Sequence, residues 1–408
     1  MHAGGDRRAR GRDRARRYAP SRQGRRVIES QRRPEPARPV ESSRPFARLV
    51  DRHRLLLCVG SGGVGKTTTS AALGVVAARR GRRAAVLTID PARRLKDSLG
   101  IDRLDGEPHR VLLADVAARG GSLDAMLLDA KRTFDALIRR YATSEAAAER
   151  VLANRIYDTI STALAGSQEY MAMERLHAIA SEERYDVLIV DTPPTHHALD
   201  FLEAPERLAA LLSSRAAAIL QNPSLILSRE SSRLAQAALA AVLRGLERFT
   251  GFQLLRDVGE FVAGMEGFSS GFQSRANEVA LFLRRHDTAF VLVTTPEAAR
   301  VGETLAFHRE LMRAGLPFGG FIVNRVLPAH VVSDSAPDPS RETGADAALA
   351  RKLALLRARF HALATAERAE IAQLERAAPD APIVEIPLQA DEPTSLRTLA
   401  LIADALDG

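Results

Sequence analysis

The stretch GSGGVGKT at residues 60–67 constrains the fold of this chain more than any other feature. It matches the pattern GxxxxGK[ST], in which glycines let successive backbone N–H groups turn inward toward phosphate oxygens. An apolar run at residues 55–57 precedes the pattern, and residues 67–80 have helical periodicity. A helix that begins at such a loop adds its N-terminal dipole to the anion site. The sequence therefore predicts a strand, a phosphate-binding loop and a helix, in that order.

The lysine of this pattern stands out against the composition. The chain contains 54 arginines but only four lysines, so a lysine at position 66 indicates a site that needs a compact ammonium rather than a planar guanidinium. We expect Lys66 to reach the β- and γ-phosphates of a nucleotide and the Thr67 hydroxyl to bind Mg²⁺. The predicted nucleotide contacts of the loop are Gly60, Gly62, Gly63, Val64, Gly65, Lys66, Thr67 and Thr68.

Apolar, β-branched runs recur along the chain and are typical of buried strands. They alternate with segments of helical periodicity, which favours an α/β fold with a parallel sheet covered by helices on both faces. Ligands of such sheets bind outside the C-terminal strand ends, and the loop, Asp90, Asp191 and Asn324 all fall at such ends. The predicted strands are residues 55–57, 82–90, 109–116, 184–192, 288–295, 318–326 and 382–387.

Two helical segments, residues 117–182 and 197–287, are too long for simple crossover helices. We expect them to form an inserted α-helical subdomain, and residues 342–378 to form one long crossover helix. The second segment contains an apolar stripe, which is either packed core or a groove for an apolar helix of a client protein. Its members are Leu254, Val258, Phe261, Val262, Met265 and Phe272.

Positive charge is concentrated in the first 46 residues. Fourteen arginines and five acidic residues give residues 1–46 a net charge of +9, against +8 for the whole chain, which leaves about −1 for the rest. Low apolar content predicts a disordered tail at 1–46 and a folded domain at 47–408. The tail is either a solvated extension or a contact for nucleic acid or an anionic membrane.

Membrane-spanning, secreted and disulfide-bonded classes are disfavoured by the sequence. No apolar run approaches the roughly 18 residues of a membrane span, and the first residues lack the apolar core of a secretory signal. We therefore expect a cytoplasmic protein. Cys58 is the single cysteine, which excludes an intrachain disulfide and a CxxC metal site.

Five segments together resemble the ArsA and tail-anchored-protein-targeting ATPases, and most closely a bacterial ArsA-related subgroup. The segments are GSGGVGKTTT, TIDPARRLKDSLG, DTPPTHHALDFL, VNRV and PLQADEP, and they occur in the order that the family shows. The resemblance implies the MinD/ParA-like branch of phosphate-loop NTPases. It further implies ATP and Mg²⁺ as ligands, ATP hydrolysis, and a dimer that switches conformation with the nucleotide.

The resemblance also implies roles for individual residues. Asp90, in a segment similar to switch I, would orient the water that attacks the γ-phosphate, although it would also suit a helix cap before Pro91. Asp191, in a segment similar to switch II, would hold Mg²⁺ through water. Asn324 resembles the adenine-contacting residue of the family, and Pro387 lies in a segment that resembles the loop over the purine.

Some positions depart from the family pattern. Ser61 stands where most members have a lysine that reaches the phosphates bound by the partner subunit. A slow homodimer, a heterodimer whose paralogous partner supplies the lysine, and substitution by Arg93 or Arg94 all stay open. Arg94 and His196 replace a small polar residue and a glycine of the two switches. The family's zinc and metalloid cysteines are missing, so we expect neither site.

Two functions of different class follow. The first is a Mg²⁺-dependent ATPase that works as a conformational switch. The second is a nucleotide-gated protein that binds a client or partner with little turnover. A third interpretation is a positioning role on a membrane or DNA, as in the MinD/ParA ATPases. The C-terminal segment 395–408 does not favour it, because this segment ends in acidic residues and looks like a packing helix.

Overall fold

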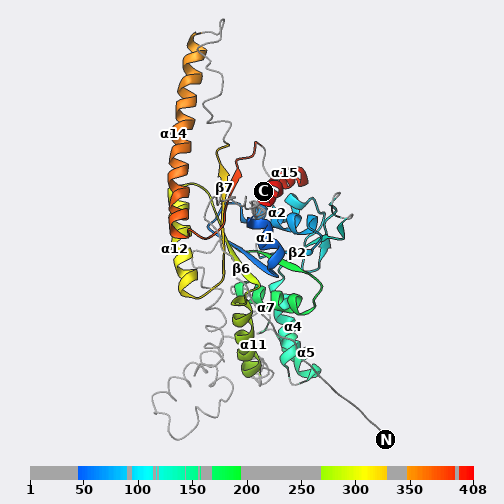
Figure 1. The fold of residues 1–408 in the computed structure, drawn as a ribbon. Coiled ribbons are helices and arrows are strands. Elements are labelled where there is room, and N and C mark those ends of the chain that lie inside the picture. The colour runs from blue at the N-terminus through cyan, green and yellow to red at the C-terminus, as the bar shows by residue number, and fades with distance from the viewer. Residues whose placement is uncertain are drawn as a thin grey trace, which may run out of the picture. The chain divides into compact units, whose positions relative to one another are not determined.

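The computed structural model describes residues 45–89, 94–113, 116, 119–142, 144–154, 157, 168–193, 268–328, 347–390 and 395–408. The chain divides into two units, Met1–Ser42 and Ser43–Gly408. The elements below belong to the second unit, drawn as a ribbon in Figure 1.

An eight-stranded sheet forms the centre of the fold, in the order β3-β4-β2-β5-β1-β6-β7-β8. Neighbouring strands are parallel except for β3 and β4, which pair antiparallel. This arrangement confirms the predicted α/β fold with a mainly parallel sheet. The strands are β1 (Leu55–Val59), β2 (Arg83–Thr88), β3 (His109–Arg110), β4 (Ser122–Leu127), β5 (Val187–Asp191), β6 (Thr288–Thr294), β7 (Phe318–Val326) and β8 (Ile383–Pro387).

Helices cover both faces of the sheet, because the strands bury apolar side chains on both sides. Leu56 and Cys58 of β1 join the core under one set of helices, whereas Leu55 and Leu57 join the core under the other. The first set is α1 (Pro45–Arg52), α2 (Lys66–Arg79), α3 (Arg94–Leu99) and α15 (Leu396–Asp407). The second set is α4 (Ala130–Tyr141), α5 (Glu145–Leu152), α7 (Gln168–Ser181), α11 (Phe268–Leu283), α12 (Ala298–Arg313) and α14 (Ala347–Ala377).

The strand predicted over residues 109–116 is shorter in the structure. Among the described residues of that range, only His109–Arg110 form a strand, β3, and Leu112 is 82% exposed. Strand β3 is the edge of the sheet, and its neighbour β4 lies inside the segment 117–182, which the periodicity predicts to be helical. Asp124 breaks the apolar pattern of β4 but is buried, because its carboxylate accepts a hydrogen bond from the Tyr185 hydroxyl at 2.8 Å and pairs with Arg110 at 2.6 Å.

The described helices of the expected helical subdomain are α4, α5, α7 and α11, and α4 contacts each of the other three. The apolar stripe from Leu254 to Met265 lies outside the described residues, as does the side chain of Phe272. The long helix expected over 342–378 is described as α14. Among the described helices, none combines the length and apolar character that a membrane crossing requires.

The first described element lies at the predicted start of the domain, residue 47. Helix α1 starts at Pro45, and the Phe46 side chain is fully buried in the core that α2 and α15 share. The remainder of the basic segment, residues 1–44, lies outside the described residues.

Candidate phosphate-binding site

The loop between β1 and α2 has the backbone that its glycines allow. Gly65 precedes the first residue of α2 with φ of 96°, in the left-handed region that side chains rarely adopt. A Cβ atom at Gly65 would lie 2.2 Å from Nδ2 of Asn324. Both the local conformation and the tertiary contact therefore require glycine at this position.

Lys66 is buried inside this loop. Its side chain lies on the first turn of α2, and the residue is 7% exposed. The ammonium group donates hydrogen bonds to the carbonyl oxygens of Gly60 at 2.8 Å and Ser61 at 2.9 Å. These contacts hold the positive charge within the turn of the loop, where an incoming phosphate would compete with the carbonyl oxygens for it. Thr67 and Thr68 follow it on α2 and are half-buried.

Asp191 lies beside the loop, at the C-terminal end of β5. In the parallel registers it is paired with Cys58 of β1 and with Thr88 of β2, so it sits between the two neighbouring strand ends. The residue is 1% exposed, and its carboxylate accepts a hydrogen bond from the Thr88 hydroxyl at 2.8 Å. A buried carboxylate next to a phosphate loop is a suitable group for holding a hydrated cation.

The chain that leads to Asp90 is hydrogen-bonded to the same end of β5. The Ile89 N–H donates to the Asp191 carbonyl oxygen at 3.1 Å, which extends the pairing of β2 with β5 by one residue. The predicted catalytic Asp90 follows directly but lies outside the described residues. The same holds for Arg93, the Arg94 side chain and residues 194–197.

Asn324, on strand β7, contacts the phosphate loop. Its Nδ2 donates to the Val64 carbonyl oxygen at 2.9 Å, and its Oδ1 accepts from the Arg325 N–H at 3.0 Å. The two residues of the first contact are 260 positions apart in the chain. Motif comparison predicts an adenine contact for Asn324 and gives no sign of this contact with the loop.

Pro387 ends β8 at the same edge. Asn324 is paired with Ile386 in the β7–β8 register, and Pro387 is paired with Val326. Pro387 is exposed, and its carbonyl oxygen accepts a hydrogen bond from the Gln389 side chain at 2.7 Å. The structure thus brings the described residues of the predicted site, from β1 to β8, to one edge of the sheet.

The cysteine of β1 lies in an environment that makes its thiol unreactive. Cys58 is fully buried under α2, and burial raises the pKa of its thiol to about 12. A neutral thiol is a poor nucleophile and a poor metal ligand. Within the described ranges, no group of three or more His, Cys, Asp or Glu side chains is placed to hold a metal ion.

Ser61 lines a small hollow between the loop and α12. The hollow measures about 140 Å³, and two carboxylates of α12, Glu303 and Glu310, line it as well. The Ser61 hydroxyl is buried and has no hydrogen-bond partner among the described residues. Because a serine side chain is uncharged, position 61 adds no positive charge to the site.

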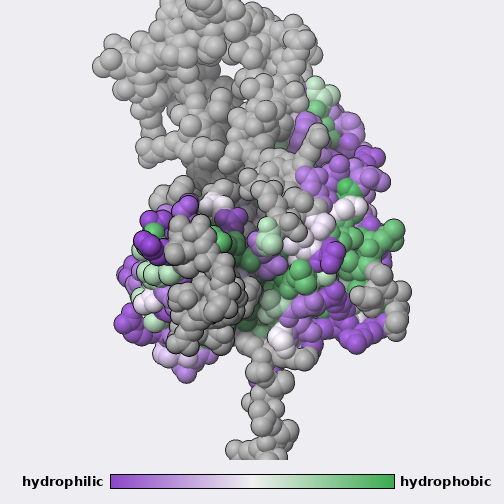
Figure 2. Space-filling model, turned by 90° about the horizontal axis from the view of Figure 1, so that it is seen from above, coloured by the Kyte–Doolittle hydropathy of each residue, from purple (hydrophilic) through white to green (hydrophobic). Residues whose placement is uncertain are grey.

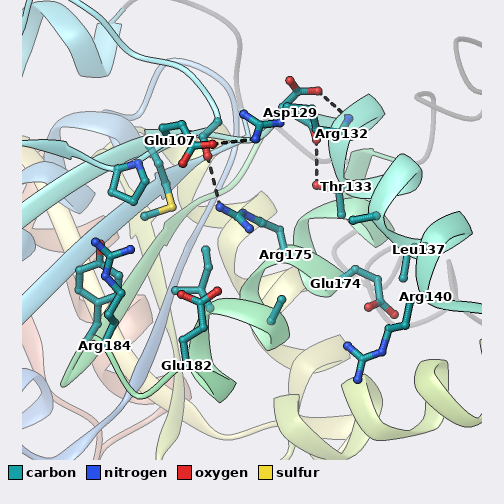
Figure 3. A pocket seen from close by; sticks show the side chains of 17 residues that line it. Glu107, Asp129, Arg132, Thr133, Leu137, Arg140, Glu174, Arg175, Glu182 and Arg184 are labelled. Atoms are coloured by element: carbon teal, nitrogen blue, oxygen red, sulfur yellow. Dashed lines mark hydrogen bonds and ion pairs between the residues drawn. The ribbon is translucent and has the colours of Figure 1, made fainter. Parts of the chain in front are cut away.

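A separate pocket of about 390 Å³ lies between α4, α7 and the chain before β3, as Figure 3 shows. Arg132 pairs with Glu107 at 2.7 Å across one side, and Arg175 donates to the Gly106 carbonyl oxygen at 3.3 Å. Four arginines and four acidic residues line this pocket, so their formal charges balance. It shares no residue with the phosphate loop, and no motif of the sequence predicts it.

Comparison with known proteins gives consistent matches. The sequence model of the anion-transporting ATPases matches residues 53–337. Protein Rv2184c of Mycobacterium tuberculosis is 36% identical over 163 residues, which is 37% of each chain. ATPase BagA of Mycobacterium tuberculosis is 25% identical across 83% of this chain and 88% of its own. ATPase ASNA1 homolog 2 of Paramecium tetraurelia is 26% identical across 66% of this chain and 74% of its own.

Proposed function

This chain belongs to the anion-transporting ATPase family, and we therefore propose that it binds ATP with Mg²⁺ and hydrolyses the ATP. In this proposal the protein is a dimer whose conformation changes as ATP is bound and hydrolysed. The observation that carries the proposal is the buried Lys66 ammonium inside a left-handed glycine turn, next to the buried Asp191 carboxylate. This pairing of an anion site with an acidic group suits a phosphate chain and its cation.

In this proposal, different residues at the C-terminal ends of the strands bind the phosphates and the Mg²⁺ ion. The loop N–H groups and Lys66 bind the phosphates, which requires the ammonium to leave the Gly60 and Ser61 carbonyl oxygens. The Thr67 hydroxyl and Asp191, through water, hold Mg²⁺, which prefers oxygen ligands and keeps several waters. Bound Mg²⁺ supplies neutralisation of the charge that develops on the phosphate oxygens.

Asp90 positions the attacking water in this proposal. It follows Ile89 in the sequence, and the hydrogen bond from the Ile89 N–H to the Asp191 carbonyl oxygen supports this role. A carboxylate that accepts a hydrogen bond from the water orients it toward the phosphorus atom.

The serine at position 61 supports a proposal that this chain hydrolyses ATP slowly by itself, or that it needs a partner subunit for fast hydrolysis. An uncharged hydroxyl at this position cannot reach the phosphates of a second subunit as a lysine would. A phosphoryl-transfer cation supplied in trans is worth about 10³–10⁵ in rate. A paralogous partner that carries this lysine would therefore raise turnover. The same feature supports a second candidate function, a nucleotide-gated binding protein with little turnover.

The deciding experiment measures ATP hydrolysis by the full chain, together with its molar mass by light scattering with and without ATP and Mg²⁺. We expect Asp90→Asn to bind ATP but lose turnover. Asp97→Asn is the matched control, because Asp97 is an exposed acid of α3. Equal turnover of wild type and Asp90→Asn would refute the catalytic role. ATP binding without turnover in the wild type would favour the nucleotide-gated alternative.

A further inference from the structure

The first half of α14 exposes a row of large apolar side chains. Leu349, Leu353, Leu356 and Leu363 are between 40% and 52% exposed, and Phe360 among them is half-buried. Figure 1 shows the start of α14 rising clear of the labelled elements, while its end lies beside α12. Figure 2 looks down from that side, where the described surface is mainly hydrophilic with separate hydrophobic patches.

This row continues a face that is buried lower on the same helix. Leu356 and Leu374 are five full turns apart, and so are Leu353 and Ile371, which places each pair on one side of α14. Ile371 and Leu374 are buried in the core under the sheet, where α14 contacts α12 and β7. The exposed row therefore faces the same side as the folded body and projects beyond it.

The spacing of the row is that of a helix-pairing seam. Successive members are four, three, four and three residues apart, from position 349 to position 363. This alternation keeps apolar side chains facing a second helix, into whose surface they insert. At 1.5 Å per residue the row is about 21 Å long. The shape and pattern fit a helix rather than a loop or a small molecule.

The charged side chains beside the seam are all basic, which favours a partner helix with acidic side chains. Residues 347–366 contain Arg351, Lys352, Arg357 and Arg359 and no acidic residue. Lys352 and Arg359 flank the seam one heptad apart, at positions where interhelical ion pairs form in coiled coils. Two copies of this half of α14 would place like charges opposite one another. An apolar helix flanked by Asp or Glu complements both features.

Two other occupants fit these observations less well. A flat lipid surface that touched the row would meet the sheet and its helices, because the row faces the side on which the body lies. The connecting sequence 329–346 carries four acidic residues, and its only apolar side chains other than alanine and proline are Val331 and Val332. Two valines are too few to cover five large apolar side chains.

We propose that residues 349–363 of α14 form a docking surface for an amphipathic helix of a different protein, apolar on one face and flanked by acidic side chains. The surface is separate from the phosphate-loop residues, so the proposal goes beyond ATP turnover and does not depend on it.

The test uses the full chain and two synthetic helical peptides with the same leucine heptads, one flanked by glutamates and the other by lysines. Fluorescence anisotropy should show binding of the acidic peptide, at least about tenfold tighter than of the basic one, and weakening with salt. Lys352→Glu with Arg359→Glu should reverse this preference. Equal binding of the two peptides, or no binding of either, would overturn the proposal.

Two neighbouring leucines provide a matched pair of variants. Leu356 belongs to the row and is 49% exposed, whereas Leu355 lies on another side of the helix and is 57% exposed. We expect Leu356→Glu to weaken binding of the acidic peptide at least about tenfold and Leu355→Glu to leave it within about twofold. Circular dichroism of both variants checks that α14 is still folded. Equal losses in the two variants would contradict the assignment.

Two further measurements exclude other occupants. Sedimentation velocity of wild type and Leu356→Glu would reveal a second copy as the occupant, if self-association were lost in the variant. Flotation with anionic phosphatidylserine vesicles would reveal a lipid surface, if the variant lost vesicle binding. Either result would overturn the proposal of an acidic helix.

Discussion

Gly65→Ala tests the packing of Asn324 on the phosphate loop. The substitution adds one methyl group at a residue whose φ is 96°. It places Cβ 2.2 Å from Nδ2 of Asn324, so the amide must move away. Its movement breaks the 2.9 Å hydrogen bond to the Val64 carbonyl oxygen.

The expected cost has two parts. A non-glycine residue in the left-handed region costs about 1–2 kcal/mol. Loss of the Asn324 hydrogen bond costs about 0.5–1.5 kcal/mol more. The free energy of unfolding of Gly65→Ala should therefore fall by about 1.5–3.5 kcal/mol.

Gly63→Ala is the matched control for the first part. Gly63 also has a positive φ, of 81°, but a Cβ atom there would have no neighbour within 4 Å. Its cost should be that of backbone strain alone, about 1–2 kcal/mol. The difference between the two variants, measured by chemical denaturation, isolates the contact with Asn324.

A double mutant completes the test. In the Asn324→Ala background the added methyl group meets no amide, so Gly65→Ala should cost no more than Gly63→Ala does in the wild type. Equal costs for Gly65→Ala with and without Asn324 would refute the argument that Asn324 packs against this glycine. Equal costs for the two alanine variants in the wild type would refute it as well.

Three further predictions concern stability and reactivity. Phe46→Ala should lower the free energy of unfolding by about 3–5 kcal/mol, because Phe46 is fully buried in the core, whereas Arg52→Ala on the exposed end of α1 should change it little; denaturant midpoints of both variants check this. Cys58 should resist a thiol reagent in the folded protein at mildly alkaline pH, because burial raises its pKa to about 12, and should react at once in guanidinium; fast labelling without denaturant would contradict its burial. Burial lowers the pKa of His308, so its contribution to stability is present above the unfolded value of about 6.5 and is lost as the pH falls through that value toward the folded pKa. Melting temperatures should therefore drop on acidification, and by less in His308→Gln; an unchanged pH dependence in that variant would count against the assignment.

The phosphate loop and most of the sheet could be predicted from the sequence because their signals are local. Glycine spacing around Lys66 specifies a turn and a helix start within a few residues. Unbroken apolar runs such as residues 289–293 specify strands buried on both faces. Parallel strands then bring their C-terminal ends to one edge, so the shared position of Asp191 and Asn324 follows from topology.

Other features depended on partners that are distant in the sequence. Strand β4 contains Asp124, whose burial is acceptable only because Tyr185 and Arg110 pair with it in the folded chain. The apolar residues after Arg110 look like a strand, yet only Val111 continues the pairing, through its N–H to the Leu123 carbonyl oxygen, and Leu112 is exposed.

The phosphate loop, the helix that follows it and the α/β class of the fold can be predicted from residue spacing along short stretches of the sequence. The packing of Asn324 against Gly65, the hydrogen bonds of Lys66 to the loop carbonyl oxygens and the exposed apolar row of α14 depend on the folded chain. A periodic pattern shows which side chains are apolar, whereas the fold determines which of them are covered by a neighbour.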